Sequence, residues 1–439
     1  MVKFSRFTHR FDLVDAVALY HSLRMKPIFL KKNILHTLDN WISTKSSNLD
    51  NVPVDLTDTV STLLKYKILT STEDEDSRVL DFVKSKIPKP SVNVCYMIIS
   101  EMCNLACKYC FVGNNNKNIR EKYFQGNNMS KLIADKAVSF FLRQLKLSQI
   151  GYTEISKPII IFYGGEPLIN FPILVYIAET INTLKSSDIY LKDVELSLIT
   201  NGTLLDEEKI LKLKDLGVSI AISVDGFTEE DNSMRVDPKG NTIFNKLLSS
   251  LDLCKQLGVK ISLSVTLTEN TIKNTKNILN LVDKYNIKAF GFNIMMSSSD
   301  FILSNEYNER AAQFIIDEFL ELRERGIYED RIIRKLRSFS SSKIYFSDCA
   351  ATSGGQIVIS PDGKVGICHG CLADKSYFIS DVFDEKFNAC ENETFLEWSQ
   401  ITPVNQNLCL DCPALGICGG GCPINARNLK QEYTIHSVD

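Results

Sequence analysis

The stretch Cys103-Asn-Leu-Ala-Cys107-Lys-Tyr-Cys110 decides how this sequence is interpreted. It directly follows an apolar run, 92–99, that has the length and composition of a buried strand. Three thiolates on one short loop can hold three irons of a [4Fe–4S] cube, which leaves the fourth iron open to a small molecule. The alternative is a zinc knuckle that takes its fourth ligand from elsewhere in the chain.

Composition limits the compartment and the partners of this chain. It has 439 residues, which indicates about two or three domains, and a net charge of −3, which does not favour a nucleic-acid partner. It contains no run of 18 apolar residues, and Met1–Arg10 lacks the apolar core of a signal peptide. We therefore expect a cytoplasmic protein with no membrane and no nucleic-acid partner.

The 13 cysteines are too many for a cytoplasmic protein unless most of them bind metal. The cytosol keeps thiols reduced, so a disulfide framework is not expected there. Three cysteines lie within 103–110 and eight within 349–422, and such clusters are typical of metal ligands. Cys95 and Cys254 stand alone and are expected to be small buried side chains.

The pattern of apolar residues divides the chain into four segments. Residues 1–90 predict helices over 31–43, 55–65 and 78–86 with a short strand at 68–70, which is typical of a winged-helix-like domain. Residues 304–347 predict a connector that contains a helix over Glu306–Arg325, and residues 348–439 are rich in cysteine, glycine and turns.

The second segment, residues 91–303, alternates strand and helix patterns. Helices are expected over 131–146, 206–216 and 271–285. Six strands are expected, at Val92–Ile99, Ile159–Tyr163, Val194–Ile199, Val218–Val224, Val259–Leu267 and Ala289–Ile294. This alternation predicts an α/β fold, a partial (β/α)6 TIM-like barrel, whose chemistry lies at the carboxyl ends of the strands.

Polar motifs follow the expected strands in order. Gly164-Gly165-Glu166-Pro167 follows the second strand, and Thr200-Asn201-Gly202-Thr203 ends the third. Ser223-Val-Asp225-Gly226 ends the fourth, and Asp231 and Arg235 come shortly after it. Each motif alone is weak, because glycine pairs usually mark turns, but four motifs in register behind a cysteine triad are not expected by chance.

This order of motifs, with Phe111 directly after the cysteines, resembles the radical S-adenosylmethionine (SAM) superfamily. The resemblance implies that Cys103, Cys107 and Cys110 hold a [4Fe–4S] cluster that cleaves SAM. It also implies that Gly164, Gly165, Glu166 and Pro167 meet the SAM amino group, that Thr200, Asn201 and Asp225 belong to the same site, that Ser223 contacts the ribose, and that Arg235 pairs with the carboxylate. Tyr109, Phe111, Phe162 and Tyr163 are expected to pack near the site.

The C-terminal cysteines resemble a SPASM domain, which carries two auxiliary [4Fe–4S] clusters and would bring the total to three. Cys349 is followed by thirteen residues, Gly363, four residues and Cys368, and then by Cys409-x2-Cys412-x5-Cys418-x3-Cys422. The resemblance implies that Cys349, Cys368 and Cys422 serve the first auxiliary cluster and that Cys409, Cys412 and Cys418 serve the second.

Two ligand positions of these clusters stay open. The family pattern has seven cysteines, of which six are matched, and no cysteine follows Cys422 in this sequence. The second cluster would then keep an open iron or take His436 or Cys390. Cys371 is the nearest candidate for the fourth ligand of the first cluster. The alternative, that Cys371 and Cys390 are unligated thiols, also stays open.

The resemblance implies an oxidoreductase that makes a 5′-deoxyadenosyl radical and takes hydrogen from a peptide. Reduction by a flavodoxin or ferredoxin is expected. The 90 residues before the barrel resemble a module that grips a leader peptide, and such modules pair the leader as an added strand. We therefore predict a maturase of a ribosomally synthesised precursor peptide that forms an intramolecular thioether or carbon–carbon crosslink.

Three alternatives remain. One is a sulfatase-maturing type of enzyme that makes formylglycine, although such enzymes carry an Asp where this chain has His369. The second is a peptide epimerase. The third is a non-catalytic iron–sulfur scaffold, which would not need the SAM motifs.

Overall fold

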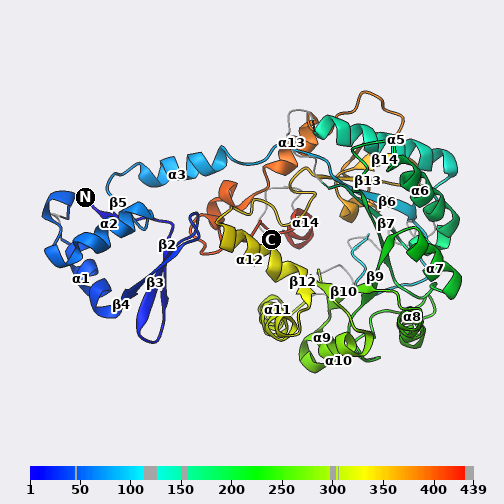
Figure 1. Ribbon diagram of the computed structural model, residues 1–439, viewed down its shortest axis with the longest axis horizontal. Coiled ribbons are helices and arrows are strands. Elements are labelled where there is room, and N and C mark those ends of the chain that lie inside the picture. Colours follow the sequence, from blue (N-terminus) through cyan, green and yellow to red (C-terminus); the bar gives the residue numbers. More distant parts are fainter. Residues whose placement is uncertain (45–46, 113–125, 150–156, 297–302, 305, 431–439) are drawn as a thin grey trace.

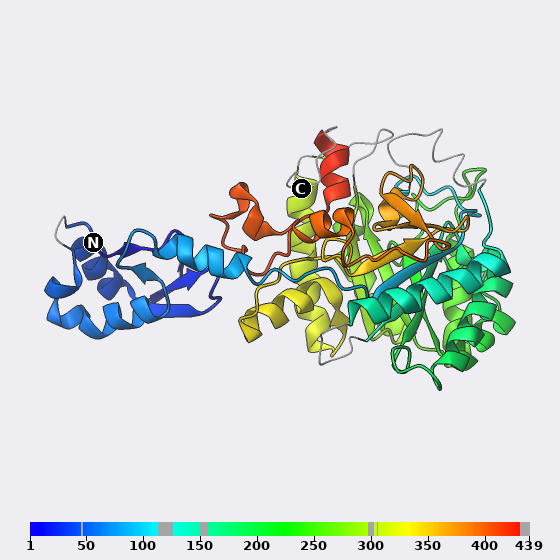
Figure 2. The ribbon, with the colours of Figure 1, turned by 90° about the horizontal axis from the view of Figure 1, so that it is seen from above.

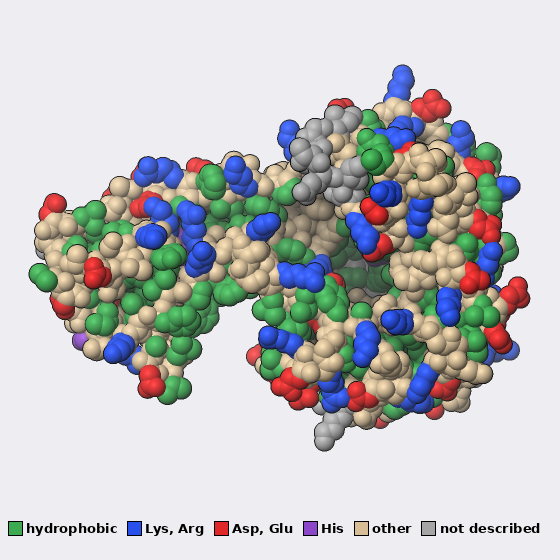
Figure 3. Space-filling view, viewed as in Figure 1, with side chains coloured by type: hydrophobic (Ala, Val, Ile, Leu, Met, Phe, Trp, Pro, Cys, Tyr) green, Lys and Arg blue, Asp and Glu red, His purple; other side chains and the backbone are tan. Residues whose placement is uncertain are grey.

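The computed structural model describes all of residues 1–439 except 45–46, 113–125, 150–156, 297–302, 305 and 431–439. Figure 1 shows a small N-terminal part that is joined to a larger α/β body by α3 (Glu75–Lys84) and the segment that follows it. On the face drawn in Figure 3, acidic and basic side chains are interspersed over both parts.

A ten-stranded sheet forms the centre of the large body, in the order β12-β11-β10-β9-β8-β7-β6-β13-β14-β15. All pairs from β12 to β13 are parallel, which confirms the predicted α/β class. The six predicted strands are present as β6 (Val94–Ser100), β7 (Ile159–Gly164), β8 (Glu195–Thr200), β9 (Val218–Val224), β10 (Ile261–Leu267) and β11 (Ala289–Ile294).

The strands are recognisable in sequence because one of their faces is buried. In β9, Val218, Ile220, Ile222 and Val224 are buried while the residues between them are more exposed, as the two-residue period of a strand requires. Helices cover the outer face of the sheet (Figures 1 and 2). They are α5 (Lys131–Ser148), α6 (Phe171–Leu184), α7 (Glu207–Asp215), α8 (Phe244–Gln256), α10 (Thr275–Tyr285) and α11 (Tyr307–Glu324).

The helix boundaries follow from capping residues. Ser130 accepts a hydrogen bond from the backbone N–H of Ile133 at the start of α5. Asp206 does the same for Lys209 at the start of α7. The prediction of a single helix over 271–285 is wrong. Thr268 caps a separate short helix, α9 (Glu269–Lys273), and the helical backbone is interrupted at Asn274.

The cysteine-rich segment continues the barrel sheet. Strand β13 (Gln356–Ile359) pairs in parallel with β6, with Gln356 opposite Val94 and Ile359 opposite Met97. Strands β14 (Lys364–Gly366) and β15 (Phe378–Asp381) extend it antiparallel. At the other edge, β12 (Tyr328–Glu329) pairs with β11 and leads into α12 (Asp330–Ser341), a helix that the sequence did not predict. The remaining helices are η3 (Pro167–Asn170), η4 (His369–Cys371), α13 (Glu393–Ser399), η5 (Pro403–Asn405), η6 (Asn407–Cys409) and α14 (Pro423–Lys430).

The N-terminal part contains the expected helices and a sheet that was missed. Helices α1 (Lys32–Ile42), α2 (Thr57–Lys65) and α3 match the prediction, with short 3-10 turns η1 (Leu49–Asn51) and η2 (Val54–Leu56) between α1 and α2. Strands β1 (Lys3–Phe4) and β5 (Leu69–Thr70) pair, and β2 (Thr8–Asp12), β3 (Ala16–His21) and β4 (Pro27–Lys31) form an antiparallel sheet. The sheet escaped notice because β2 is largely exposed and carries no apolar alternation.

The N-terminal part packs on the cysteine-rich segment. Phe7, Leu23, Val79 and Val83 form an apolar cluster with Val404 and Leu415. Beside it, a guanidinium nitrogen of Arg6 lies 2.8 Å from the Asp411 carboxylate. The backbone at Gly416 passes so close to Ser22 that a Cβ atom there would lie 2.3 Å from the Ser22 carbonyl oxygen.

One helical stretch among the described residues, Pro167–Leu184, is long and apolar enough to cross a membrane by length and composition alone. In the structure its residues Leu174, Ile177, Ala178 and Ile181 are buried in the main core, where a helix that covers a sheet is expected to place them.

Candidate active site

The three cysteines of the 103–110 loop follow the carboxyl end of β6, as predicted, and all are partly buried. The loop is fastened to the segment after β9 by two backbone hydrogen bonds. The N–H of Ala106 donates to the carbonyl of Val236 at 2.8 Å, and that of Lys108 donates to Met234 at 3.0 Å. The structure therefore places the cysteine loop directly beside Arg235.

The thiols of this loop lie in surroundings that penalise an unbound thiolate. Burial raises the pKa of Cys103. Burial also raises the pKa of Cys107, which the charge of Arg235 partly offsets. A bound metal would remove this penalty, because cysteine binds iron as the thiolate.

The cysteines of the 103–110 loop do not form a ready-made site for a single metal ion. A single zinc ion needs donors that converge at about 2.0–2.3 Å from one point. Within the described ranges, no three His, Cys, Asp or Glu side chains converge in that way, the 103–110 cysteines included. A four-iron cube is larger than one ion and is bound by more widely spaced thiolates.

Arg235 and Asp225 are buried next to Tyr109 of the cysteine loop. The Tyr109 hydroxyl donates to the Asp225 carboxylate, with 2.7 Å to each oxygen, and accepts from Arg235 Nη1 at 2.6 Å. Burial raises the pKa of Asp225 to about 6, although the Arg235 charge opposes this. Tyr109 lies near the site as expected, and its hydroxyl in addition joins three segments of it.

Glu166 holds the ends of β7 and β8 together. Its carboxylate is fully buried and accepts from the Leu168 N–H at 3.0 Å, the Thr200 hydroxyl at 2.8 Å and the Asn201 N–H at 2.8 Å. Three such bonds stabilise a buried carboxylate. Glu166 and Thr200 thus lie together, as predicted. Their side chains hydrogen-bond to each other and hold the framework of the site.

Gly164 and Gly165 let the β7 end touch the start of the cysteine loop. A Cβ atom at Gly165 would lie 2.4 Å from the Met102 carbonyl oxygen, so no other residue fits there. The N–H groups of Gly165 and Glu166 donate to the carbonyls of Ser100 and Met102. An ammonium group is a donor and needs acceptors, so it is the carbonyl oxygens of this segment that can receive it.

Asn104, inside the cysteine loop, was missed as a site residue. Its side-chain amide donates to the Thr203 hydroxyl at 2.8 Å, and its oxygen accepts from the Asn201 amide at 2.9 Å. Asn201 in turn accepts from the Thr203 N–H at 2.9 Å. Two features of the sequence could have indicated this contact: an amide side chain within the cysteine loop and the Thr-Asn-Gly-Thr loop after β8. Ser223 lies on β9, opposite Ser264 of β10.

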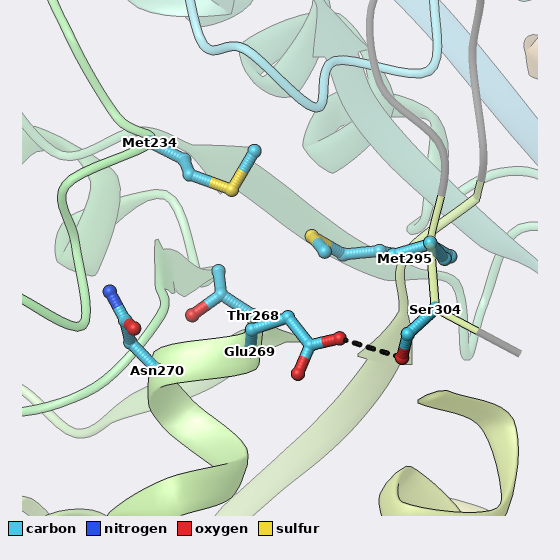
Figure 4. Close-up of a pocket in the computed structure, with 7 residues that line it drawn as sticks. Met234, Thr268, Glu269, Asn270, Met295 and Ser304 are labelled. Atoms are coloured by element: carbon cyan, nitrogen blue, oxygen red, sulfur yellow. Dashed lines mark hydrogen bonds between the residues drawn. The ribbon is translucent and has the colours of Figure 1, made fainter. Parts of the chain in front are cut away.

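A cavity of about 200 Å³ opens at the carboxyl ends of β10 and β11 (Figure 4). Met234, Met295 and Leu303 supply apolar walls, and Thr268, Glu269, Asn270 and Ser304 supply polar groups. Glu269 accepts from the Ser304 hydroxyl at 3.2 Å at this mouth. Since Met234 is the residue before Arg235, the cavity and the cysteine loop share one wall. No motif in the sequence indicated this cavity.

The first set of C-terminal cysteines is brought together, and Cys371 is among them. The pKa of Cys368 is raised by its hydrogen bond to Cys371, by burial, and by the nearby Cys371, Cys349 and Cys422. Cys371 is fully buried, whereas Cys349 and Cys422 are exposed. This proximity favours Cys371 over a distant residue as the fourth member of the set.

The second set, Cys409, Cys412 and Cys418, also gathers on one loop. Burial raises the pKa of Cys409, with further contributions from Cys418 and Cys412. Cys390 does not join either set, because its thiol lies 3.4 Å from the Ser148 hydroxyl at the end of α5. This contact does not favour Cys390 as the residue that completes the second cluster. His436 lies outside the described residues.

An aromatic group lies between the two cysteine regions. The His369 ring stacks on Tyr96 with 4.4 Å between centroids, and it meets Phe111 and Tyr163 edge-on at 5.6 and 5.4 Å. Burial lowers the pKa of His369 to about 4, so its ring is neutral at pH 7. Phe162 is fully buried in the core, as expected for a packing residue.

A family model for the radical SAM superfamily matches residues 97–282, which include the cysteine loop, the β7, β8 and β9 motifs and Arg235. The chain carries a radical SAM domain. Among curated relatives, the radical SAM cyclopropyl synthase TigE of Paramaledivibacter caminithermalis is 25% identical over 337 residues, 74% of this chain and 66% of TigE. The alignment thus spans just under two thirds of TigE.

A second curated relative of this chain is a cysteine-type anaerobic sulfatase-maturating enzyme of Clostridium novyi. It is 24% identical over 344 residues, which cover 74% of this chain and 86% of that enzyme. Both alignments are much longer than the radical SAM domain match at residues 97–282. Each therefore extends into the cysteine-rich segment or the N-terminal part.

Two solved structures share the fold. The structure of anSMEcpe with bound AdoMet has a TM-score of 0.61 at 20% identity, and the match covers 78% of this chain and 94% of that one. Streptococcus suis SuiB bound to the precursor peptide SuiA has a TM-score of 0.51 at 16% identity, and that match covers 100% and 98%. The second match includes the N-terminal part, because it covers the whole chain.

Proposed function

We propose that this chain is a radical SAM maturase of a ribosomally synthesised precursor peptide and that it forms an intramolecular crosslink. The observation that carries the proposal is the open three-cysteine loop clamped against a buried arginine. Cys103, Cys107 and Cys110 would hold a [4Fe–4S] cluster, and SAM would fill its open iron position. When bound, the cluster supplies one electron to the sulfonium, which gives methionine and a 5′-deoxyadenosyl radical that takes hydrogen from the peptide.

The residues present fit SAM. Arg235 is 4% exposed, and its Nε atom has no hydrogen-bond partner within the part of the chain that the structure describes. A buried guanidinium with a spare donor suits a carboxylate. The carbonyl oxygens near Gly164 suit an ammonium group. The neighbouring cavity, with its two methionines, suits an apolar or aromatic ring.

The peptide substrate is supported by the N-terminal part. Its sheet has β2 and β4 as edge strands, and an extended leader peptide adds to such an edge through backbone hydrogen bonds. SuiB, which matches along the whole chain, was solved with a precursor peptide. We therefore assign leader binding to residues 1–90, the radical SAM barrel to 91–303, the connector to 304–347 and the auxiliary SPASM clusters to 348–439.

Two auxiliary [4Fe–4S] clusters would complete a set of three. Cys349, Cys368, Cys371 and Cys422 would hold one, and Cys409, Cys412 and Cys418 would hold the other. Each is suited to accept the electron that the substrate radical must lose before a crosslink closes. A flavodoxin or ferredoxin would supply the electron for SAM cleavage.

Formylglycine formation is a second candidate, because a sulfatase-maturating enzyme is among the relatives. His369 argues against formylglycine formation, because sulfatase-maturing enzymes carry an Asp at the position that His369 occupies. Its ring is enclosed by Tyr96, Tyr163 and Phe111.

The test uses the full chain with its iron and sulfide reconstituted under anaerobic conditions. The protein is incubated with SAM, dithionite and a candidate precursor peptide chosen from neighbouring genes. A peptide that loses two hydrogens, with fragmentation suppressed between two residues, supports the crosslink and locates it. A peptide of unchanged mass that takes up deuterium from solvent supports an epimerase instead. Absence of 5′-deoxyadenosine from a fully loaded sample would overturn the proposal.

A further inference from the structure

The Tyr109 hydroxyl occupies the space between two oppositely charged buried side chains. Arg235 and Asp225 are 4% and 0% exposed, and they form a long ion pair with 3.4 Å between Nη1 and Oδ1. Unhindered Arg–carboxylate pairs close to about 2.7–2.9 Å and are frequently bidentate. Here the shorter contacts run through the phenol, at 2.7 Å to Asp225 and 2.6 Å to Arg235.

The backbone around this trio is fixed, so any adjustment falls to the side chains. Hydrogen bonds from Ala106 to Val236 and from Lys108 to Met234 hold both flanks of Arg235. On the other side, Asn232 donates to the Gly226 carbonyl at 2.9 Å and accepts from the Asp225 N–H at 3.0 Å. The guanidinium can therefore swing toward Asp225 only if the hydroxyl is removed.

We propose that Tyr109 is a positioning residue whose hydroxyl acts as a spacer and keeps Arg235 available to an anionic ligand. The hydroxyl satisfies Asp225 as a donor and Arg235 as an acceptor, so neither charge is left unpaired while they are held apart. The Arg235 Nε atom then keeps a donor that no described residue uses. The inference rests on the proposed function in that the ligand is the carboxylate of SAM.

The geometry makes a specific claim about what Phe would do at this position. Without the hydroxyl, both buried charges lose a partner, and the cheapest remedy is to shorten the existing 3.4 Å Arg235–Asp225 ion pair into a close contact. That pair would hold the guanidinium away from the ligand. The variant keeps all three cysteines of the loop, so iron content should not change.

The experiment measures SAM affinity of reconstituted full-length protein by equilibrium dialysis, together with iron and sulfide content and the EPR signal of the reduced cluster with and without SAM. Tyr109→Phe should bind SAM about tenfold more weakly or worse, with unchanged iron content. Tyr285→Phe is the matched control, because it removes a buried-ring hydroxyl that donates to Asp252 at 3.0 Å far along the chain from the cysteines.

A second comparison tests the spacer role itself. Asp225→Asn removes the charge that would capture Arg235, so adding Tyr109→Phe to it should change SAM affinity by less than about threefold. A structural role for the tyrosine would lower affinity equally in both backgrounds, and that result would overturn the inference.

The failures of the two proposals can be told apart. Wild type and Tyr109→Phe that bind SAM equally well would overturn this inference and leave the proposed function standing. Loss of iron in Tyr109→Phe in step with loss of SAM binding would also overturn it, since the tyrosine would then act on the cluster. A fully loaded wild type that does not bind SAM would overturn both.

Discussion

Lys335 on α12 donates a hydrogen bond of 2.8 Å to the carbonyl oxygen of Cys418. The same ammonium group lies 3.2 Å from the carboxylate of Asp348, the residue before Cys349. Arg334 on the same helix donates to the Asp348 carbonyl at 2.6 Å, and the Asp348 N–H donates to Gly419 at 2.8 Å. One helix that the sequence did not predict thus joins the segments that carry the two sets of C-terminal cysteines.

Lys335→Met should weaken the contacts that α12 makes with the two cysteine-bearing segments. Methionine keeps the length of the side chain but has no donor for Cys418 or Asp348, so we expect the free energy of unfolding to fall by about 1–2 kcal/mol. Iron content after reconstitution should fall as well, because Cys418 would be held less firmly. Urea unfolding and iron analysis check this. Lys212→Met, which removes an ion pair of 2.7 Å to Glu179 on the barrel surface, serves as the control and should change neither value appreciably.

Cys371→Ala should lower the iron and sulfide content, since Cys371 lies with Cys368, Cys349 and Cys422. Cys390→Ala should not, because Cys390 contacts Ser148 of α5. Iron analysis and the EPR spectrum of the reduced protein compare the two variants. Equal iron content in Cys371→Ala and wild type, with an unchanged spectrum, would exclude Cys371 as a ligand.

Glu318 on α11 should make the protein less stable as pH rises. It is 2% exposed, its Oε2 has no partner among the described residues, and burial raises its pKa to about 7. The folded state therefore holds a proton that the unfolded chain releases above about pH 4.5, and stability is lost as pH rises from there through 7.

Glu318→Gln should accordingly stabilise the protein at pH 8 by about 1–3 kcal/mol and have little effect at pH 4.5. Urea unfolding at both values measures this. Glu324→Gln, at an exposed position of the same helix, is the control. A Glu318→Gln variant that is equally stabilised at both values would show that its effect does not come from ionisation.

His21 should make the docked N-terminal part sensitive to acid. It is fully buried, accepts from the Leu23 N–H at 3.2 Å and contacts the Ser5 hydroxyl. Burial lowers its pKa to about 4, with Arg24 and His9 acting in the same direction and Asp76 opposing them. Since the unfolded chain binds this proton more readily, stability should fall as pH drops from about 6.5 toward 4.

Limited proteolysis between pH 7 and pH 5 detects this loss. Cleavage should rise first within residues 1–90, which contain His21. His21→Gln should flatten the dependence on pH, whatever it does to stability at pH 7. Cleavage that rises first in the barrel would contradict the assignment to His21.

Gly416→Ala should displace the N-terminal part, because the added Cβ would lie 2.3 Å from the Ser22 carbonyl oxygen. The backbone at Ser22 cannot yield as a side chain would, so the two parts must separate. Small-angle X-ray scattering should show a larger radius of gyration. Gly291→Ala in β11, whose Cβ would meet its nearest neighbour at 3.7 Å, should leave the scattering unchanged.

Much of the barrel could be predicted because its signals are local. Each strand from β6 to β11 is a short apolar run that ends in a polar motif, and the parallel order places Thr200, Asp225 and Gly164 at one edge. The helices predicted over 131–146 and 206–216 are present for the same reason, and their starts are capped by Ser130 and Asp206.

The missed features depend on pairing with other segments, near or far along the chain. β2 is exposed and has no apolar period, so only its partner β3 reveals it as a strand. Nothing near Gln356 indicates that it pairs with Val94. The role of Tyr109 depends on Asp225 and Arg235, which lie more than 100 residues away. Such contacts carry no local pattern, and a single sequence does not reveal them.

The pairing of β13 with β6 also bears on how this protein is made. Val94 and Gln356 lie about 260 residues apart, so the edge of β6 stays uncovered during synthesis until most of the chain has left the ribosome. An uncovered central strand is a template for association with other chains. We expect a chain cut at residue 347 to aggregate rather than yield a free barrel.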